Sequence, residues 1–167
     1  MTIRLAHVLV LAGAIPACMK ASPTPKDGVT TMRATGQFDV KVSPVPAGDK
    51  SDGPAFGRFV FDKRFHGDVE AVSAGEMLAF GDGRSGAGAY VALERVTGTV
   101  RGRKGTFVLQ HNGTMVGGTP HMIVTVVPES GTDELSGLAG TMTIHIVDGN
   151  HSFDFDYTLP DAARQRP

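Results

Sequence analysis

Two ionisable side chains interrupt apolar segments in the middle of this chain. Glu94 lies within the mostly apolar run YVALERV, and His111 follows Phe107 and Leu109 at two-residue intervals. Side chains two residues apart in a strand share a face, so both groups are predicted to point inward among apolar neighbours. A carboxylate beside an imidazole is suited to proton transfer. Burial is expected to raise the pKa of Glu94.

Each of these two groups has an ordinary structural alternative. In the alternative for Glu94, the carboxylate pairs with a basic residue on a neighbouring strand or points to solvent. In the alternative for His111, the residue is a buried histidine whose ring donates a hydrogen bond to a backbone carbonyl. If the two side chains lie on opposite sides of the strand wall, proton transfer between them is excluded.

Further polar and apolar side chains are candidates for contact with a ligand. Glu76 shares a strand face with two apolar residues, Tyr90 carries a phenol, and Gln110 adjoins His111 and must face the opposite side. The predicted ligand-binding set is Glu76, Tyr90, Gln110, Phe107 and Met115. The remaining histidines are weaker candidates, namely His66, His121, His145 and His151.

Several classes of function are excluded by what the sequence lacks. The six histidines are scattered and there is a single cysteine, so no metal-binding motif is present and neither a metal nor a cofactor is expected. The chain has no Gly-x-Ser-x-Gly motif, which argues against a serine hydrolase. The formal net charge of −1, without a basic stripe, argues against a nucleic-acid partner.

The elements that must position these groups are strands. Alternating apolar and polar residues predict eight of them, over residues 32–42, 56–66, 69–80, 88–97, 105–115, 122–127, 140–147 and 152–159. No helix is expected between them. An antiparallel array of this size hides its edges most simply by closing, so the fold predicted is all-β, a single eight-stranded antiparallel β-barrel.

The middle strands are apolar on both faces, which is unusual for a barrel wall. The strands around residues 90–96, 122–127 and 142–147 show apolar side chains in both parities. Because the interior covers only one face, the other needs a lid, a partner or a membrane surface. We therefore expect association with further copies of the chain.

The N-terminus is typical of a targeting segment. Residues 1–17 contain one arginine and a short apolar stretch, too short to span a bilayer, and end in the run IPAC. This run resembles the lipobox of bacterial lipoproteins, with Cys18 as the lipid acceptor. A plain cleaved secretory signal and an uncleaved start are the alternatives. The expected location is the cell envelope, lipid-anchored or free in the periplasm or outside the cell.

The predicted organisation has three further parts. Residues 18–31 are rich in proline, serine and threonine and form a tether. Residues 32–159 form the barrel domain, and residues 160–167 are a polar tail. With only one cysteine no disulfide is expected within the chain. Contact with a membrane is expected only through a lipid on Cys18.

Several segments resemble a known family. They read ATGQF, FHGD, SAGEML, YVALERV, FVLQHNGTM, VTVVPESGT and LAGTM. Together they resemble a family of small bacterial proteins known only as domain of unknown function 3224, over residues 32–159. The resemblance implies an eight-stranded antiparallel barrel like that of allene oxide cyclase, without an established activity. Barrels of this type elsewhere include cyclases and dirigent proteins, which guide a reactive small molecule without a cofactor.

Three functions are compatible with these observations. The first is a binding module that holds a small apolar or amphipathic ligand in the barrel interior. The second is a cofactor-free isomerase or cyclase in which Glu94 and His111 move protons. The third is a structural envelope protein whose barrel is filled by its own side chains. A cavity in the barrel interior would exclude the third function, and a solid interior would exclude the first two.

The targeting segment yields a direct prediction. In a bacterial host, Cys18→Ala should release the protein from the membrane fraction and abolish its labelling by a lipid precursor, because the acceptor thiol is gone. Unchanged fractionation of the variant would contradict the lipid anchor.

Overall fold

The computed structural model describes residues 30–46, 56–81 and 86–160. The targeting segment, Cys18, the tether up to residue 29, and all but the first residue of the tail lie outside the described residues. The predictions about them therefore stay predictions.

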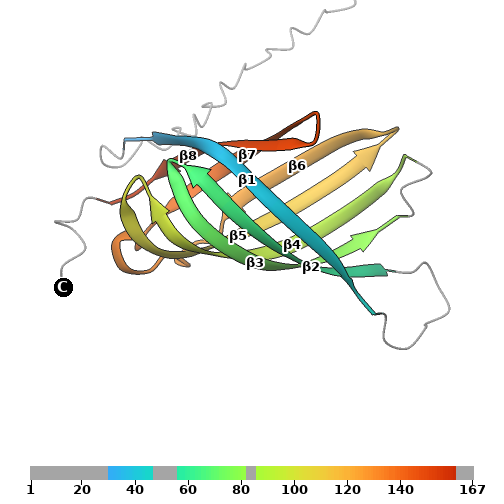
Figure 1. Ribbon diagram of the computed structural model, residues 1–167, viewed down its shortest axis with the longest axis horizontal. Coiled ribbons are helices and arrows are strands. Elements are labelled where there is room, and N and C mark those ends of the chain that lie inside the picture. Colours follow the sequence, from blue (N-terminus) through green and yellow to red (C-terminus); the bar gives the residue numbers. More distant parts are fainter. Residues whose placement is uncertain (1–29, 47–55, 82–85, 161–167) are drawn as a thin grey trace, which may run out of the picture.

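Eight strands form a closed barrel in which each strand pairs antiparallel with the next and β8 returns to β1 (Figure 1). This arrangement confirms the predicted all-β fold class. The strands are β1 (Met32–Val45), β2 (Phe56–Gly67), β3 (Val69–Phe80), β4 (Gly88–Val100), β5 (Arg103–Val116), β6 (Thr119–Val126), β7 (Ala139–Val147) and β8 (Asn150–Thr158). A single turn of 3-10 helix, η1 (Asp133–Leu135), was not predicted.

Most strand boundaries lie within three residues of the predicted ones, and the main differences are at tight turns. Arg101 and Gly102 connect β4 to β5 with φ of 47° and 80°, so both strands run further than the alternation indicated. Gly117 and Gly118 do the same between β5 and β6, with φ of 56° and 79°. Two positive-φ residues in succession match the twist of a two-residue hairpin, which glycine adopts without strain.

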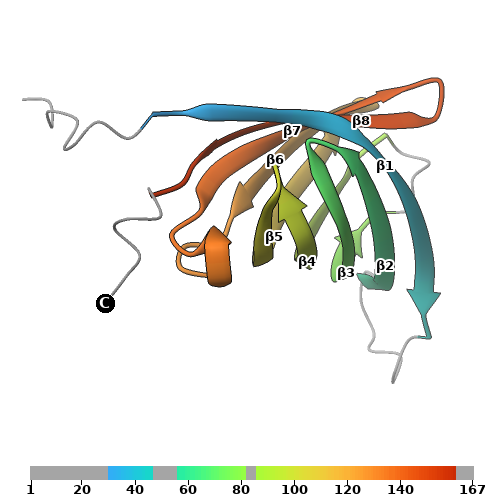
Figure 2. The same ribbon diagram turned by 60° about the vertical axis from the view of Figure 1, so that its left-hand side comes forward.

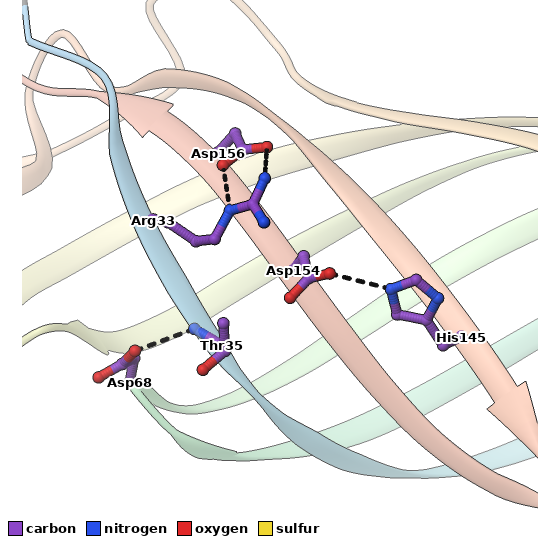
Figure 3. Close-up of polar contacts among 6 residues, drawn as sticks. All are labelled: Arg33, Thr35, Asp68, His145, Asp154 and Asp156. Atoms are coloured by element: carbon purple, nitrogen blue, oxygen red, sulfur yellow. Dashed lines mark hydrogen bonds and ion pairs between the residues drawn. The ribbon is translucent and has the colours of Figure 1, made fainter.

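The closing seam between β1 and β8 is reinforced on its outer face (Figure 3). Arg33 donates from Nε and Nη2 to the two carboxylate oxygens of Asp156, both at 2.7 Å. Nearby, the backbone N–H of Thr35 donates to Asp68 at 3.0 Å, and His145 bonds Asp154 at 3.0 Å. These contacts are exposed, and each contributes little to stability. The bidentate ion pair between Arg33 and Asp156 favours one register of β1 against β8.

The seam between β6 and β7 is the least paired part of the barrel. Thr125 and Thr141 are its one recorded residue pair among the described residues. The link between the two strands carries η1 and lies at the same end of the barrel as the C-terminus of β8 (Figure 2). Leu135 and Leu138 from this link are buried, and they belong to the hydrophobic core.

One end of the barrel interior is solid. Its largest fully buried apolar side chains are Phe65, Phe107, Phe153, Phe155, Leu109, Leu135 and Leu138. The rings of Phe107 and Phe155 stack with centroids 6.0 Å apart, and Phe65 meets Phe153 edge-on at 5.7 Å. This packed half leaves the other half of the interior as the place where a ligand site can exist.

Exposed apolar side chains lie on the outer face of β4, as predicted, and also on that of β3. Leu78, Val91 and Leu93 are 43%, 52% and 57% exposed. On β7 the outer face mainly carries Thr141, Thr143 and His145, so the expectation of a second apolar face is wrong for that strand. Association of copies through this face stays a prediction. The described part of the chain contains no helix with the length and hydropathy needed to cross a membrane.

Candidate functional site

Four polar side chains are buried together inside the barrel. Glu94 on β4 has no exposed surface, and Lys63, Ser73 and His111 on β2, β3 and β5 are less than 9% exposed. Lys63 Nζ and His111 Nε2 each lie 2.8 Å from Glu94 Oε2. Ser73 Oγ donates to Glu94 Oε1. We call these four residues the Glu94 cluster; its carboxylate oxygens receive three hydrogen bonds.

Strand register brings the Glu94 cluster together. On β4, Glu94 shares its inward face with Ala92 and Val96, and Ala92 pairs with His111 on β5. Directly opposite Glu94 on β3 is Gly75. A Cβ at Gly75 would overlap the ring of Phe61, so glycine leaves the space in which that ring packs beside the cluster.

The Glu94 carboxylate is ionised, which corrects the expectation of a raised pKa. Burial does act to raise the pKa, and it is the largest single influence. The hydrogen bond from His111, the charge and hydrogen bond of Lys63, and the hydrogen bond from Ser73 together outweigh it and lower the pKa to about 2. Glu94 therefore does pair with a basic residue, but Lys63 lies on β2 and not on a strand next to β4, where the structural alternative expected it. The contact with His111 is present as well.

Lys63 is the functional residue that the sequence analysis missed. Its ammonium lies 4.8 Å, 5.4 Å and 5.7 Å from the ring centroids of Phe38, Phe61 and Phe65. Aromatic faces attract a cation, and these rings hold the lysine within the interior. The sequence did contain a signal for Lys63, because this residue shares the apolar face of its strand with Phe61 and Phe65. The same pattern, a charged residue among apolar ones on one face, had singled out Glu94.

A cavity of about 170 Å³ lies beside the cluster, with side chains from all eight strands in its wall. Lys63 and His111 line it, and Glu94 is not among the lining residues. The apolar lining is Phe38, Val40, Val42, Phe61, Met77, Ala92, Met122, Ile144 and Ile146. Val42 and Ile146 are 50% and 60% exposed, which places the opening at the end of the barrel that joins β1 to β2 and β7 to β8.

Tyr90 and His151 are the other polar side chains in the cavity wall. Tyr90 donates its hydroxyl hydrogen bond to Met122 Sδ at 2.8 Å. Burial, and then the charge of Glu94, raises the pKa of Tyr90, so the phenol remains protonated at neutral pH. The ring of His151 lies against Phe38, with centroids 5.0 Å apart.

The other predicted ligand-binding residues lie away from this cavity. Glu76 and Gln110 point outward, and Glu76 pairs with Arg58 on the outer surface at 3.2 Å. Phe107 lies in the packed half of the interior, and Met115 is 40% exposed near the end of β5. Glu76 does share its face with Leu78 and Phe80, but that face is the outer one.

Apart from His151, the other histidines that the structure describes lie on the surface. His66 faces Asp39 and Glu70 at 4.0 Å and 3.8 Å, His145 bonds Asp154, and His121 is exposed. Within the described ranges, no three histidine, cysteine, aspartate or glutamate side chains gather as metal ligands would.

Comparison with known proteins identifies the family and leaves the function open. The profile of the family "Protein of unknown function (DUF3224)" matches residues 34–157, and the chain belongs to this family. A crystal structure of a DUF3224 protein of unknown function from Shewanella oneidensis MR-1 is 43% identical, with a TM-score of 0.73. The similarity covers 80% of this chain and 100% of that one. No curated protein matches the chain.

The ionised state of Glu94 predicts a specific acid sensitivity. Its pKa is lower in the folded protein than the usual 4.5, so its stabilisation is complete above about pH 4.5 and is lost as the pH falls towards 2. This group should account for a loss of about 3 kcal/mol in the free energy of unfolding. Chemical denaturation at several pH values should show that loss in the wild type, and Glu94→Gln should lack this component. An equal acid response in both proteins would show that folding does not lower the pKa of Glu94.

The pair of Lys63 and Glu94 predicts strong coupling. Lys63→Met leaves a buried carboxylate without its cation and should cost about 3–5 kcal/mol. The double variant Lys63→Met/Glu94→Gln removes both charges and should lose much less than the two single variants combined.

The exposed pair Arg58 and Glu76, on β2 and β3, is the matched control for this cycle. Arg58→Met and Glu76→Gln should cause much smaller losses with weak coupling, because solvent screens both charges. Additive losses at Lys63 and Glu94 would contradict the buried ion pair.

Proposed function

We propose that this barrel binds a small, mostly apolar molecule with one polar oxygen in the cavity beside the Glu94 cluster. The observation that carries the proposal is the cavity itself, about 170 Å³ in volume, with apolar side chains over most of its wall. An apolar cavity of about 150 Å³ is large enough for one benzene molecule. The ligand class that fits is therefore a single ring or a short chain.

The polar groups of the cavity support an oxygen on that ligand. Lys63 has three N–H donors and gives one to Glu94, and Tyr90 carries a hydroxyl. Lys63 and His111 both bond the same carboxylate oxygen, so they lie side by side at one part of the wall. Few, fixed polar groups in an apolar wall are typical of a site that orients a small molecule.

The structural alternative, a barrel filled by its own side chains, has less support. The packed half of the interior matches it, but the half towards the β1–β2 and β7–β8 connections does not. Export and a lipid tether on Cys18 remain part of the proposal, because the N-terminal pattern favours them; the ligand would then be met in the cell envelope.

Filling the cavity tests the binding. Ala92 is buried in the cavity wall. Ala92→Leu should weaken the binding of cyclohexanone about tenfold or more, because the leucine side chain would occupy volume that the ring needs. Ala89→Leu, on the outer face of the same strand, is the matched control and should bind as the wild type does.

Chemical-shift titration of amide signals measures both affinity and location. Shifts should gather at the cavity-lining strands in the wild type, and circular dichroism should confirm that both variants are folded. Equal binding by Ala92→Leu, or shifts confined to the outer surface, would contradict an interior site.

A further inference from the structure

The hydrogen bonds of the Glu94 cluster determine which nitrogen of His111 carries the proton. An ionised carboxylate has no proton to donate, and Glu94 Oε2 accepts from Lys63 as well. The contact of 2.8 Å between His111 Nε2 and Glu94 Oε2 must therefore be an N–H bond from the ring to the carboxylate. In the neutral ring the lone pair then lies on Nδ1.

That lone pair is unused and accessible. Glu94 is the one hydrogen-bond partner of the His111 ring among the residues that the structure describes. Among the described residues, every fully buried side-chain nitrogen or oxygen has a hydrogen-bond partner. Since Nδ1 of His111 has no such partner among them, it is not fully buried. His111 lines the interior cavity and also a groove that includes Glu76 and Gln110. We infer that the free nitrogen meets a ligand in the cavity, because Lys63 lines the cavity and not that groove.

The neighbouring ammonium supplies the complementary charge. Lys63 shares Glu94 Oε2 with His111 and also lines the cavity, so its remaining N–H groups can donate to a ligand oxygen near the imidazole. A fixed cation beside an oxygen stabilises negative charge that develops there, and more strongly in an apolar wall than in water. A base and an oxyanion-stabilising group therefore lie together in one small cavity.

We propose that His111 is a catalytic base that moves a proton between carbon atoms of a small cyclic β,γ-unsaturated ketone. The proposal rests on binding in this cavity. His111 Nδ1 takes a proton from the carbon between the carbonyl and the C=C bond. The C–H electron pair forms a double bond to the carbonyl carbon and the C=O π pair moves to the oxygen, which gives a dienolate whose oxygen accepts from Lys63. The same proton returns to the γ-carbon, and the double bond becomes conjugated with the carbonyl.

This cycle balances without a co-reactant. One C–H bond breaks and another forms, and nothing is oxidised or reduced. Glu94 does not touch the substrate and acts as a positioning residue: it fixes the ring tautomer and stabilises the imidazolium that forms during the cycle. His151 and Tyr90 also face the cavity, and neither bonds the Glu94 carboxylate in the described structure.

The first test measures the tautomer directly and needs no activity. Nitrogen-15 spectra of the histidine rings at neutral pH should show His111 protonated on Nε2 with a free Nδ1. In Glu94→Gln the preference should weaken, because the carboxylate is gone. A proton on Nδ1 in the wild type would overturn the proposed role of His111.

The second test follows the reaction with 3-cyclohexenone as the probe, whose conversion to the conjugated 2-cyclohexenone is read by ultraviolet absorption. Removal of a positioned base costs about 10²–10⁴ in rate, so His111→Gln should lose at least about a hundredfold. His121→Gln, at an exposed position on β6 outside the cavity lining, is the matched control and should retain the wild-type rate. Exchange of the α-protons of cyclohexanone in D₂O, followed by proton NMR, should give the same order of rates.

The outcomes separate proton transfer from binding. If cyclohexanone binds inside the barrel and the wild type is no faster than His111→Gln, catalysis is overturned while the binding function stands. If neither ketone shifts the signals of the cavity strands, both proposals fail. If His111→Gln does not fold, the tautomer measurement on the wild type still decides the role of His111.

Discussion

A single negative charge inside an apolar barrel sets the conditions for the rest of the interior. The Glu94 carboxylate has no exposed surface, so its desolvation must be offset by groups that point at it from other strands of the barrel. Lys63, Ser73 and His111 do so from β2, β3 and β5. A shift of any of these strands by one residue would turn its polar group outward and leave the charge less compensated. The cluster thus favours one register across four adjacent strands.

The same cluster lies where the interior changes from packed to open. An eight-stranded barrel is only just wide enough for its own side chains, so a cavity needs small residues at some positions of the wall. Large rings such as Phe107 and Phe155 fill one half. Towards the other end Ala92 lines the cavity, and Gly113 faces the ring of Tyr90, which a Cβ there would overlap. The volume available to a ligand is therefore a consequence of residue size along β4 and β5.

Alternation along the chain was enough to predict the strands, their closure, and the inward direction of Glu94 and His111. It was not enough for the pKa of Glu94. The direction of that shift depends on the hydrogen bond from His111 and then on Lys63 and Ser73, whose contacts with Glu94 follow from strand register and not from spacing. Alternation also misplaced Glu76, since it says which residues share a face but not which face is inner when both are apolar. Lys63 itself was within reach of the rule applied to Glu94, as a polar residue on the apolar face of its strand.

Stability alone is a weak reason for such a cluster. Apolar side chains of similar volume often replace a buried ion pair at no cost to stability, because they avoid the desolvation of two charges. What apolar replacements cannot provide is a ring with a fixed tautomer and an ammonium with donors left over, both in the wall of a cavity. Glu94 lies outside the cavity lining, so its effect on a bound molecule passes through Lys63 and His111. On this reasoning, the buried carboxylate is what holds in place the two polar groups, Lys63 and His111, that line the cavity.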